Sequence, residues 1–487
     1  MDELRKKTVV GSFWALLERF GYLGIQFISN IVLSRLLMPS DFGTIGILMV
    51  FTTISYVLID SGLSSALIQK KNISEEDKST VFFTNLALGG FVYMVLFFSA
   101  PIIANYFHNP EIKKLLRVIE LIVVIDAFAA IQSTILAREM NFKILTICKI
   151  FSIIIAVIVS IVLAYQGMGV WALVVQYLLF SVCRASFLWL RTKWRPVIAF
   201  SKKSFNSLFG FGSKLLVSTL ISTVYGQLQS IIIGRRYSAS DLGYYTQARQ
   251  LMQIPTDSLS RVVDSVSFPA YSKIQSERQN LKVMVRQNLL ILLFINTPLM
   301  FFLSTLAKPL LIFLYSEKWL ESVPYFRFLC LGFGVLIIIH NNSLTALKSV
   351  GRTDTVLKLE IIKKILGVLL LVCGMHYWGI WGLMYALAVN SFIELFLNGG
   401  CLKKEIDYGP LDQIKDLLPP LFLSLIASFV IYIFLTYVPI TNNFILLLLS
   451  FIIFVFIYLL GAYLMKFEAL NMLRKIVADI ILRQRGN

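Results

Sequence analysis

Polar side chains recur at helical spacing inside a long apolar stretch near the middle of the chain. Between residues 206 and 235 they are separated by four, four, three and four positions and so share one face of a helix: Lys214, Ser218, Ser222, Tyr225 and Gln229. Lysine suits a phosphate or carboxylate, and tyrosine offers a ring face against which a sugar can stack. The stripe is therefore a candidate binding face for an anionic, polar molecule.

Neighbouring apolar segments carry similar stripes. Segment 8–37 contains Glu18, Arg19, Tyr22, Gln26 and Ser29; segment 240–268 contains Arg249, Gln253, Asp257, Ser260, Arg261 and Asp264; segment 42–64 has a weaker version with Thr53, Asp60 and Ser64. We expect the cations Lys214, Arg249, Arg19 and Arg261 to bind an anionic substrate. We expect Glu18, Tyr22, Ser218, Ser222, Tyr225, Gln229, Gln253 and Asp257 to line the same passage. The alternative is that these groups only cross-link helices, with Glu18–Arg19 and Arg261–Asp264 as structural ion pairs.

Carboxylates inside apolar segments are candidates for coupling to a proton or sodium gradient, because a charge in a membrane is costly unless it has a function. They are Asp60, Glu120, Asp126, Asp264 and Glu394. The five cysteines are scattered singly, without metal-site or CxxC spacing, and no G-x-x-x-x-G-K-[ST] pattern occurs. We therefore expect no metal and no cofactor, and an energy source other than nucleotide hydrolysis.

The elements that position these side chains must be membrane-spanning helices. The chain has 487 residues, of which 57% are hydrophobic and only 15% charged, with a mean hydropathy of +0.77, and apolar runs near 20 residues recur throughout. We predict an all-α polytopic membrane protein with fourteen spans, near 8–37, 42–64, 80–106, 115–137, 142–165, 169–191, 206–235, 240–268, 287–315, 323–348, 354–376, 380–402, 416–438 and 442–465.

Lysine and arginine are concentrated in alternate loops, which places both termini in the cytoplasm. The net charge of +18 is consistent with this orientation rather than with nucleic-acid binding. The tail 466–487 alternates apolar and basic faces and is expected to lie on the cytoplasmic surface. The stretch KKNISEEDKST (70–80) and the connector RTKWRPVIAFSKKS (191–204) are expected to be solvated charge and lipid-headgroup contacts.

The chain also contains an internal repeat. SNIVLSRLLMPSDFG (29–43) matches QSIIIGRRYSASDLG (229–243), SAPIIANYF (99–107) matches AKPLLIFLY (307–315), and GVWAL (169–173) matches GIWGL (379–383). These matches predict six-helix lobes at 1–200 and 201–405, two extra helices within 406–465, and the basic tail. Because six is even, the lobes are related by a parallel pseudo-two-fold axis, with a passage between them. Ser40-Asp41 and Ser240-Asp241 are expected to cap equivalent helices.

The order LSRLLMPSDFGTIGI, DSGLSSALIQKKNISEEDKST, GVWALVVQYL resembles the polysaccharide-export flippases of the O-antigen and colanic-acid type. These belong to the multidrug/oligosaccharidyl-lipid/polysaccharide exporter superfamily. The similarity covers most of residues 1–400, and DSGLSSALIQ (60–69) is its most distinctive part.

The resemblance implies movement of undecaprenyl-pyrophosphate-linked oligosaccharide across a bacterial inner membrane by rocking of two lobes. Membrane lipids would be further partners, and a polysaccharide polymerase or glycosyltransferases could work beside the protein. Two transport alternatives stay open, a drug/cation antiporter and a peptidoglycan-precursor flippase. A membrane enzyme would need a large external loop with reactive groups, and the longest predicted outer loops have about ten residues. We therefore expect a transporter, not an enzyme.

Overall fold

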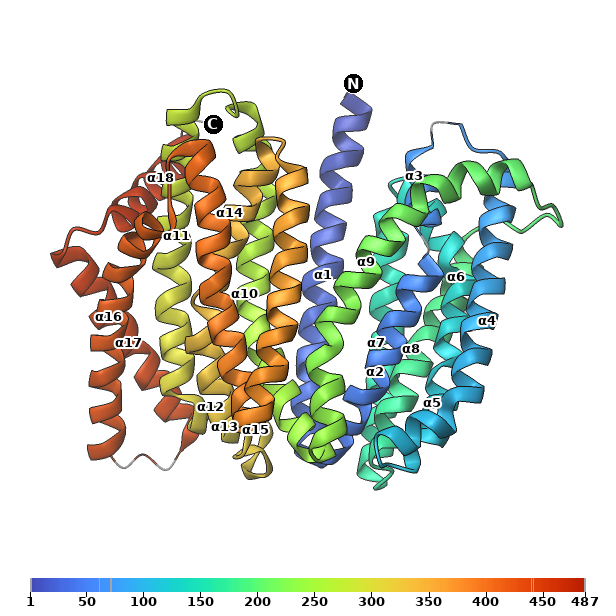
Figure 1. The fold of residues 1–487 in the computed structure, drawn as a ribbon, viewed down its shortest axis with the longest axis horizontal. Coiled ribbons are helices and arrows are strands. Elements are labelled where there is room, and N and C mark those ends of the chain that lie inside the picture. Colours follow the sequence, from blue (N-terminus) through green and yellow to red (C-terminus); the bar gives the residue numbers. More distant parts are fainter. Residues whose placement is uncertain (1, 61, 71, 439, 441, 486–487) are drawn as a thin grey trace. The chain divides into compact units, whose positions relative to one another are not determined.

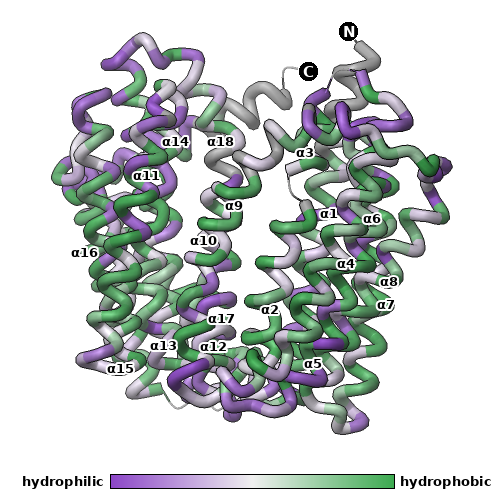
Figure 2. The backbone as a smooth tube through the Cα atoms, turned by 45° about the vertical axis from the view of Figure 1, so that its right-hand side comes forward, coloured by the Kyte–Doolittle hydropathy of each residue, from purple (hydrophilic) through white to green (hydrophobic). Residues whose placement is uncertain are grey.

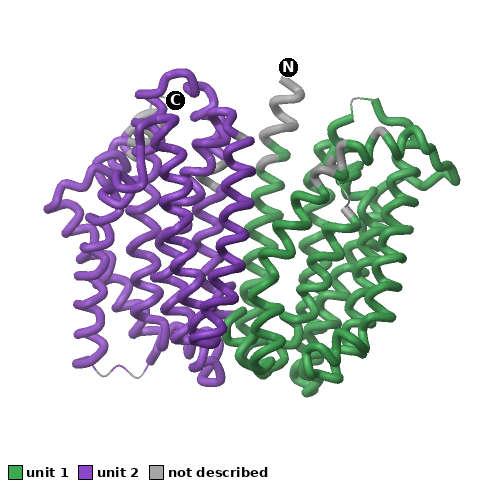
Figure 3. The backbone as a smooth tube through the Cα atoms, viewed as in Figure 1, with its two compact units in different colours: residues 1–246 green, residues 247–487 purple. Residues whose placement is uncertain are grey.

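The computed structural model describes residues 2–60, 62–70, 72–438, 440 and 442–485, and every regular element within these ranges is helical (Figure 1). The chain forms two compact units, residues 1–246 and 247–487 (Figure 3). Nine of the described helices are long and apolar enough to cross a membrane. In both units, hydrophobic residues dominate the middle of most helices and hydrophilic ones gather toward their ends (Figure 2). The prediction of an all-α polytopic membrane protein is confirmed.

Unit 1 is a bundle in which α1 packs on α7, α7 on α8, and α4 on α6. Its helices are α1 (Asp2–Leu36), α2 (Pro39–Asp60), α3 (Leu63–Gln69), α4 (Glu75–Tyr106), α5 (Glu111–Ile119), α6 (Leu121–Arg138), α7 (Phe142–Tyr165), α8 (Val170–Arg191), α9 (Lys202–Arg236) and the start of α10 (Ala239–Lys273). Leu63, Leu67, Phe82 and Leu208 form one of its buried clusters, which joins α3, α4 and α9. The first helix of the predicted second lobe thus begins packed on elements of unit 1.

Unit 2 continues α10 from Gln247. Its further elements are α11 (Arg278–Thr305), α12 (Ala307–Tyr315), η1 (Glu317–Trp319), α13 (Ser322–Leu329), η2 (Cys330–Gly334), α14 (Ile337–Ser349), α15 (Thr353–Ile406), α16 (Pro410–Tyr437), α17 (Asn443–Leu464) and α18 (Glu468–Arg485). The side chain of Arg286 ties α11 to α16 through a bidentate pair with Asp416, at 3.0 Å from Nη2 to Oδ1 and 3.0 Å from Nε to Oδ2. The Tyr408 hydroxyl donates a third hydrogen bond to Asp416, at 2.6 Å.

All fourteen predicted spans fall on helices, but several are interrupted. The span 42–64 ends at Asp60 and is followed by Gly62 in a left-handed conformation and by α3. The spans 115–137 and 287–315 are each two helices, and 323–348 contains the π-helical turn η2. The spans 354–376 and 380–402 are two helices, as predicted; the label α15 covers both, and they are separated at Gly379, where φ is 59° and ψ is −138°. The predicted lobes, residues 1–200 and 201–405, stay a prediction. The two compact units are defined by packing, whereas the lobes are defined by the sequence repeat.

The capping prediction was right for the aspartates and wrong for the serines. Asp41 accepts the backbone N–H of Met38 at 2.9 Å, and Asp241 accepts that of Ser238 at 3.1 Å. Ser40 and Ser240 lie inside the first turn instead. A carboxylate at the third helical position that reaches back to the residue before the helix is half of a capping box, and at Ser238 the serine side chain completes it by accepting the N–H of Asp241 at 3.1 Å.

The repeated turns pack directly against each other. A Cβ atom added to Gly43 would overlap the carbonyl oxygen of Ala239, and one added to Gly243 would overlap that of Pro39. The same hypothetical atoms would lie 3.0 Å from the nitrogen of Gly243 and 3.2 Å from that of Gly43. A contact in which residue i meets j and j meets i is what a two-fold axis produces. The repeat is therefore visible in space at the first turns of α2 and α10.

Candidate functional site

Asp126 lies at the centre of a polar node inside unit 1. Its carboxylate accepts hydrogen bonds from Arg184 Nη2 at 2.9 Å and Ser181 Oγ at 2.9 Å on α8, and from the Tyr56 hydroxyl at 2.5 Å on α2. The carboxylate is 7% exposed and the guanidinium side chain 30% exposed. A buried carboxylate with three donors, one of them a cation, is satisfied in place. In this arrangement Asp126 joins three helices.

Glu120 lies six residues before Asp126, at the break between α5 and α6. It is fully buried, and it accepts a hydrogen bond from Thr52 Oγ1 at 2.8 Å. Thr52 and Tyr56 are one turn apart on α2, so a single polar face of α2 meets both carboxylates. No cation is paired with Glu120 among the described ion pairs. Asp126 thus has a cationic partner, whereas Glu120 is held by the neutral donor Thr52.

The polar stripe of α1 meets α7 and α8 within unit 1. Glu18 pairs with Lys149 at 2.8 Å, and not with Arg19, which is half-buried. The Lys149 ammonium also lies 4.6 Å from the centre of the Tyr22 ring. Farther along, Gln176 donates to Ser29 at 3.1 Å. Glu18 and Tyr22 are thus brought together around a cation that the sequence analysis did not single out.

The polar stripe of α9 contains both buried and exposed side chains. Gln229 is buried and accepts a hydrogen bond from the Tyr245 hydroxyl at 2.6 Å. Ser218 and Ser222 are exposed and Tyr225 is half-buried. The side chain of Lys214 lies outside the described residues. The face is therefore accessible over the two turns that carry the serines.

The predicted residues of α10 belong to unit 2. Arg249 and Gln253 are half-buried, whereas Asp257 and Arg261 are exposed. The side chains of Asp60 and Asp264 lie outside the described residues. The passage between the repeats stays a prediction.

Unit 2 has polar clusters of its own. Asn288 on α11 donates to Ser267 at 2.9 Å, to the Tyr271 hydroxyl at 2.7 Å and to Asn342 Oδ1 at 3.1 Å. On α15, Glu394 accepts from Asn390 at 2.8 Å.

Lys363, only 4% exposed, pairs with Glu360 on the same helix. The Lys363–Glu360 pair and the Asn390–Glu394 pair each join residues one turn apart.

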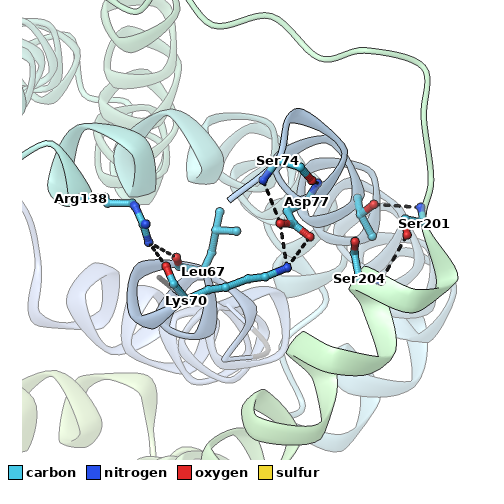
Figure 4. Close-up of polar contacts among 8 residues, drawn as sticks. Leu67, Lys70, Ser74, Asp77, Arg138, Ser201 and Ser204 are labelled. Carbon is cyan, nitrogen blue, oxygen red and sulfur yellow. Dashed lines mark hydrogen bonds and ion pairs between the residues drawn. The ribbon is translucent and has the colours of Figure 1, made fainter. Parts of the chain in front are cut away.

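A further polar cluster, in unit 1, lies where α3 and α4 meet (Figure 4). Lys70 Nζ holds both oxygens of Asp77 at 2.8 Å, while Asp77 and Ser74 form a capping box at the start of α4. Arg138 donates to the last carbonyls of α3, those of Leu67, Ile68 and Lys70. The expectation of solvated charge was wrong for Asp77, which is 2% exposed. The charges of this stretch instead fix the loop between α3 and α4.

Sequence reasoning missed most partners of these clusters: Thr52, Tyr56, Lys149, Ser181, Arg184, Asn288 and Asn342. Arg184 carried a usable signal, because it stands within an otherwise apolar span. Threonine, serine and asparagine carried none, since such residues in membrane helices often bond only their own backbone. Among the described residues, His, Cys, Asp and Glu do not gather in a group that could hold a metal ion.

The family described as "Polysaccharide biosynthesis protein" matches residues 32–324. The succinoglycan biosynthesis transport protein ExoT of Rhizobium meliloti (strain 1021) is 26% identical over 331 residues, covering 68% of this chain and 67% of that protein. The lipopolysaccharide biosynthesis protein WzxC of Escherichia coli (strain K12) is 24% identical over 432 residues, covering 88% of both. The teichuronic acid biosynthesis protein TuaB of Bacillus subtilis (strain 168) is 24% identical over 356 residues, covering 73% of this chain and 74% of that protein.

Solved structures share the fold. The lipid II flippase MurJ in an inward closed conformation superposes with a TM-score of 0.75 at 19% identity, covering 94% of this chain and 98% of that one. An inward-facing multidrug resistance MATE family transporter of the MOP superfamily superposes with a TM-score of 0.60 at 17% identity, covering 80% and 94%. The chain thus shares its fold with these two solved structures.

Proposed function

The chain belongs to the polysaccharide biosynthesis protein family, and from this premise we propose that it is a flippase for lipid-linked oligosaccharides. The cargo is an undecaprenyl-pyrophosphate-linked repeat unit, which moves from the cytoplasmic to the outer leaflet of a bacterial inner membrane. Both termini lie in the cytoplasm. The protein performs no covalent chemistry on its cargo.

The observation that carries this proposal is the combination of family and fold in one chain. Relatives named for succinoglycan and lipopolysaccharide biosynthesis match two thirds or more of its length. Its fold is shared over 94% of its residues with a protein named as a lipid II flippase. A flippase that supplies polysaccharide synthesis is the function that both properties have in common.

The mechanism follows from the charges. A pyrophosphate carries at least two negative charges and binds best to fixed cations, which Lys214, Arg249, Arg19 and Arg261 supply in the proposed passage. Alternating access exposes these cations first to one leaflet and then to the other. Coupling to a proton or sodium gradient goes through an intramembrane carboxylate, with Glu120 and Glu394 as the leading candidates. A polysaccharide polymerase or glycosyltransferases act on the same lipid before and after transport.

The test is genetic and chemical. Deletion of the gene is expected to cause lipid-linked oligosaccharide to accumulate on the cytoplasmic side, measured by lipid extraction and by lectin access in spheroplasts. Lys214→Ala and Arg249→Ala are expected to reproduce the accumulation, and Lys214→Arg to relieve it in part. Lys113→Ala, at an exposed lysine of α5 outside the stripes, is the control and is expected to export normally at equal membrane abundance.

Two outcomes would redirect the assignment. Accumulation of the peptidoglycan lipid precursor, in place of an oligosaccharide of another composition, would indicate a peptidoglycan-precursor flippase. Loss of resistance to cationic dyes with unchanged lipid-linked glycans would indicate a drug/cation antiporter. Normal export in both alanine variants would remove Lys214 and Arg249 from the site while leaving the family function in place.

A further inference from the structure

The connector between α8 and α9 (residues 192–201) is held in a defined path along the start of α4. Trp194 Nε1 donates to Glu75 at 2.7 Å, the N–H of Val197 to Ser79 Oγ at 3.1 Å, and the N–H of Ser201 to Thr80 Oγ1 at 3.0 Å. The last of these bonds is drawn in Figure 4 beside Ser204, whose own N–H bonds to Ser201 Oγ. A loop bound at three points to the first two turns of a helix is a fixed structural element.

Arg195 folds the first half of the connector back onto α8. Its guanidinium donates to the carbonyls of Thr192 and Trp194 at 2.8 Å and of Trp189 at 3.1 Å. It also lies 5.3 Å from the centre of the Trp189 ring. One carbonyl in the last turn of α8, that of Trp189, is thereby satisfied, together with two carbonyls of the connector itself.

Between these anchors the connector presents apolar side chains outward. Val197 is 55% exposed, Phe200 is 61% exposed and Ile198 is 97% exposed. Leaving side chains of this size in water forfeits about 1.5–3 kcal/mol each relative to burial. The backbone bonds of Val197 and Ser201 hold Ile198 and Phe200 in this position, so the exposure is built into the path of the loop.

Basic residues flank the apolar ones. Lys193 precedes them, Lys202 and Lys203 follow them, and all three side chains are exposed. The anchoring residues Glu75, Ser79 and Thr80 lie in the first two turns of α4, and α8 ends just before the connector. Both helices are candidate membrane spans. The loop therefore stands at the level where the chain passes between water and hydrocarbon, and in Figure 1 it projects clear of the helices beside the start of α4.

We propose that residues 193–203 dock into the lipid leaflet and bind the headgroups of anionic phospholipids. Ile198 and Phe200 insert among the upper acyl segments, and Lys193, Lys202 and Lys203 contact the phosphates. An apolar tip flanked by lysines is the pattern that binds anionic membranes, because burial and charge act together. The connector thus anchors the junction between the two repeats to the bilayer, whichever cargo the protein moves.

The proposal is tested on the full-length protein in nanodiscs, with cysteine-free background variants carrying Ile198→Cys, Phe98→Cys or Asn72→Cys labelled with the fluorophore NBD. Phe98, 69% exposed on α4, reports hydrocarbon; Asn72, exposed in the loop before α4, reports water. The label at position 198 is expected to be quenched by nitroxide-bearing lipids as at position 98 and protected from iodide, unlike position 72. Quenching by iodide equal to that at position 72 would overturn the proposal.

Headgroup binding is tested separately, by comparing nanodiscs with and without phosphatidylglycerol. Phosphatidylglycerol is expected to move the NBD label at position 198 deeper into the bilayer. The double variant Lys202→Gln/Lys203→Gln is expected to abolish most of this change in depth. The matched control is Lys113→Gln/Lys114→Gln, which neutralises another adjacent pair of exposed lysines and is expected to leave it unchanged. Equal depth in both lipid compositions would overturn the assignment of anionic headgroups. Protection from iodide without quenching by lipid nitroxides would point to a protein partner and would also overturn the proposal.

Discussion

Gly43 and Gly243, which occupy equivalent positions of the internal repeat, lie against each other with no room for a Cβ atom on either. The obstacle on each side is a backbone carbonyl, of Ala239 and of Pro39, and a carbonyl at the start of a helix cannot move without moving the helix. The first turns of α2 and α10 can therefore approach this closely only because both positions are glycine. This relation gives the first prediction.

Gly43→Ala and Gly243→Ala should each destabilise the protein, because either methyl group forces α2 and α10 apart. Overpacking against backbone typically costs about 1–3 kcal/mol, and we expect a lower melting temperature in detergent by fluorescence-detected size exclusion. Gly46→Ala is the control on the same helix: its Cβ would meet Leu242 and Thr246 side chains at 3.6 Å, an ordinary contact. Equal melting temperatures for the Gly43 and Gly46 variants would contradict the close crossing.

Thr52→Val should destabilise unit 1 more than Thr53→Val. Thr52 is the donor to the fully buried Glu120 at 2.8 Å, whereas Thr53 bonds only the carbonyl of Met49 on its own helix at 2.6 Å. Removing the partner of a buried polar group costs about 1–3 kcal/mol. Thermal unfolding of the two isosteric variants measures the difference, and indistinguishable curves would show that Glu120 does not depend on this bond.

Asp126 and Arg184 should show strong coupling in a double-mutant cycle. Removing one partner of a buried ion pair leaves an uncompensated charge, at a cost of about 3–5 kcal/mol. Asp126→Asn and Arg184→Gln are each expected to lower stability markedly, and the double variant to lose less than the sum. Additive losses would mean that the two side chains act independently. Lys78→Gln, which breaks the more exposed pair with Glu75, is expected to change stability by less than about 1 kcal/mol.

Ser79→Ala and Thr80→Val should release the connector from α4. Each removes one acceptor of a connector N–H, and a hydrogen bond worth about 1 kcal/mol corresponds to roughly fivefold faster amide exchange. Hydrogen–deuterium exchange of peptides that cover Val197 and Ser201 reads this directly. Thr84→Val is the control, one turn farther along α4, because Thr84 bonds only the carbonyl of Thr80. Unchanged exchange in the Ser79 and Thr80 variants would show that the connector is held by other contacts.

Asp416→Asn should destabilise unit 2 much more than Asp407→Asn. Asp416 is bound bidentately by Arg286 and also by Tyr408, while Asp407 pairs with Lys282 at 3.2 Å with its side chain 69% exposed. The hydrogen bond from Lys282 lowers the pKa of Asp407 from its ordinary 3.8. A lowered pKa stabilises the fold above 3.8 and loses that effect as the pH falls through the folded-state value. Unfolding at neutral pH compares the two variants, and a larger loss for Asp407→Asn would contradict this ranking.

The spans were predictable from sequence because a membrane helix needs about twenty apolar residues, whatever it packs against. Breaks inside the spans were harder to predict from sequence. The turn at Gly62 and the π-helical turn at Cys330–Gly334 depend on what surrounds them and not on apolar length. For the candidate site, sequence identified Glu120 and Asp126 as costly groups. It could not supply Thr52 or Arg184, which lie 68 and 58 residues away and meet these carboxylates only through the packing of α2, α6 and α8.

The node at Asp126 also bears on how the chain enters the membrane. During translation Tyr56 emerges 70 residues before Asp126, but Ser181 and Arg184 leave the ribosome 55 and 58 residues after it. An aspartate at the centre of an inserting helix costs about 2.5–3.5 kcal/mol, so α6 reaches the translocon with its charge still uncompensated. We therefore expect lateral release of α6 into lipid to wait for the arrival of α8, so that the two nascent helices integrate as a pair.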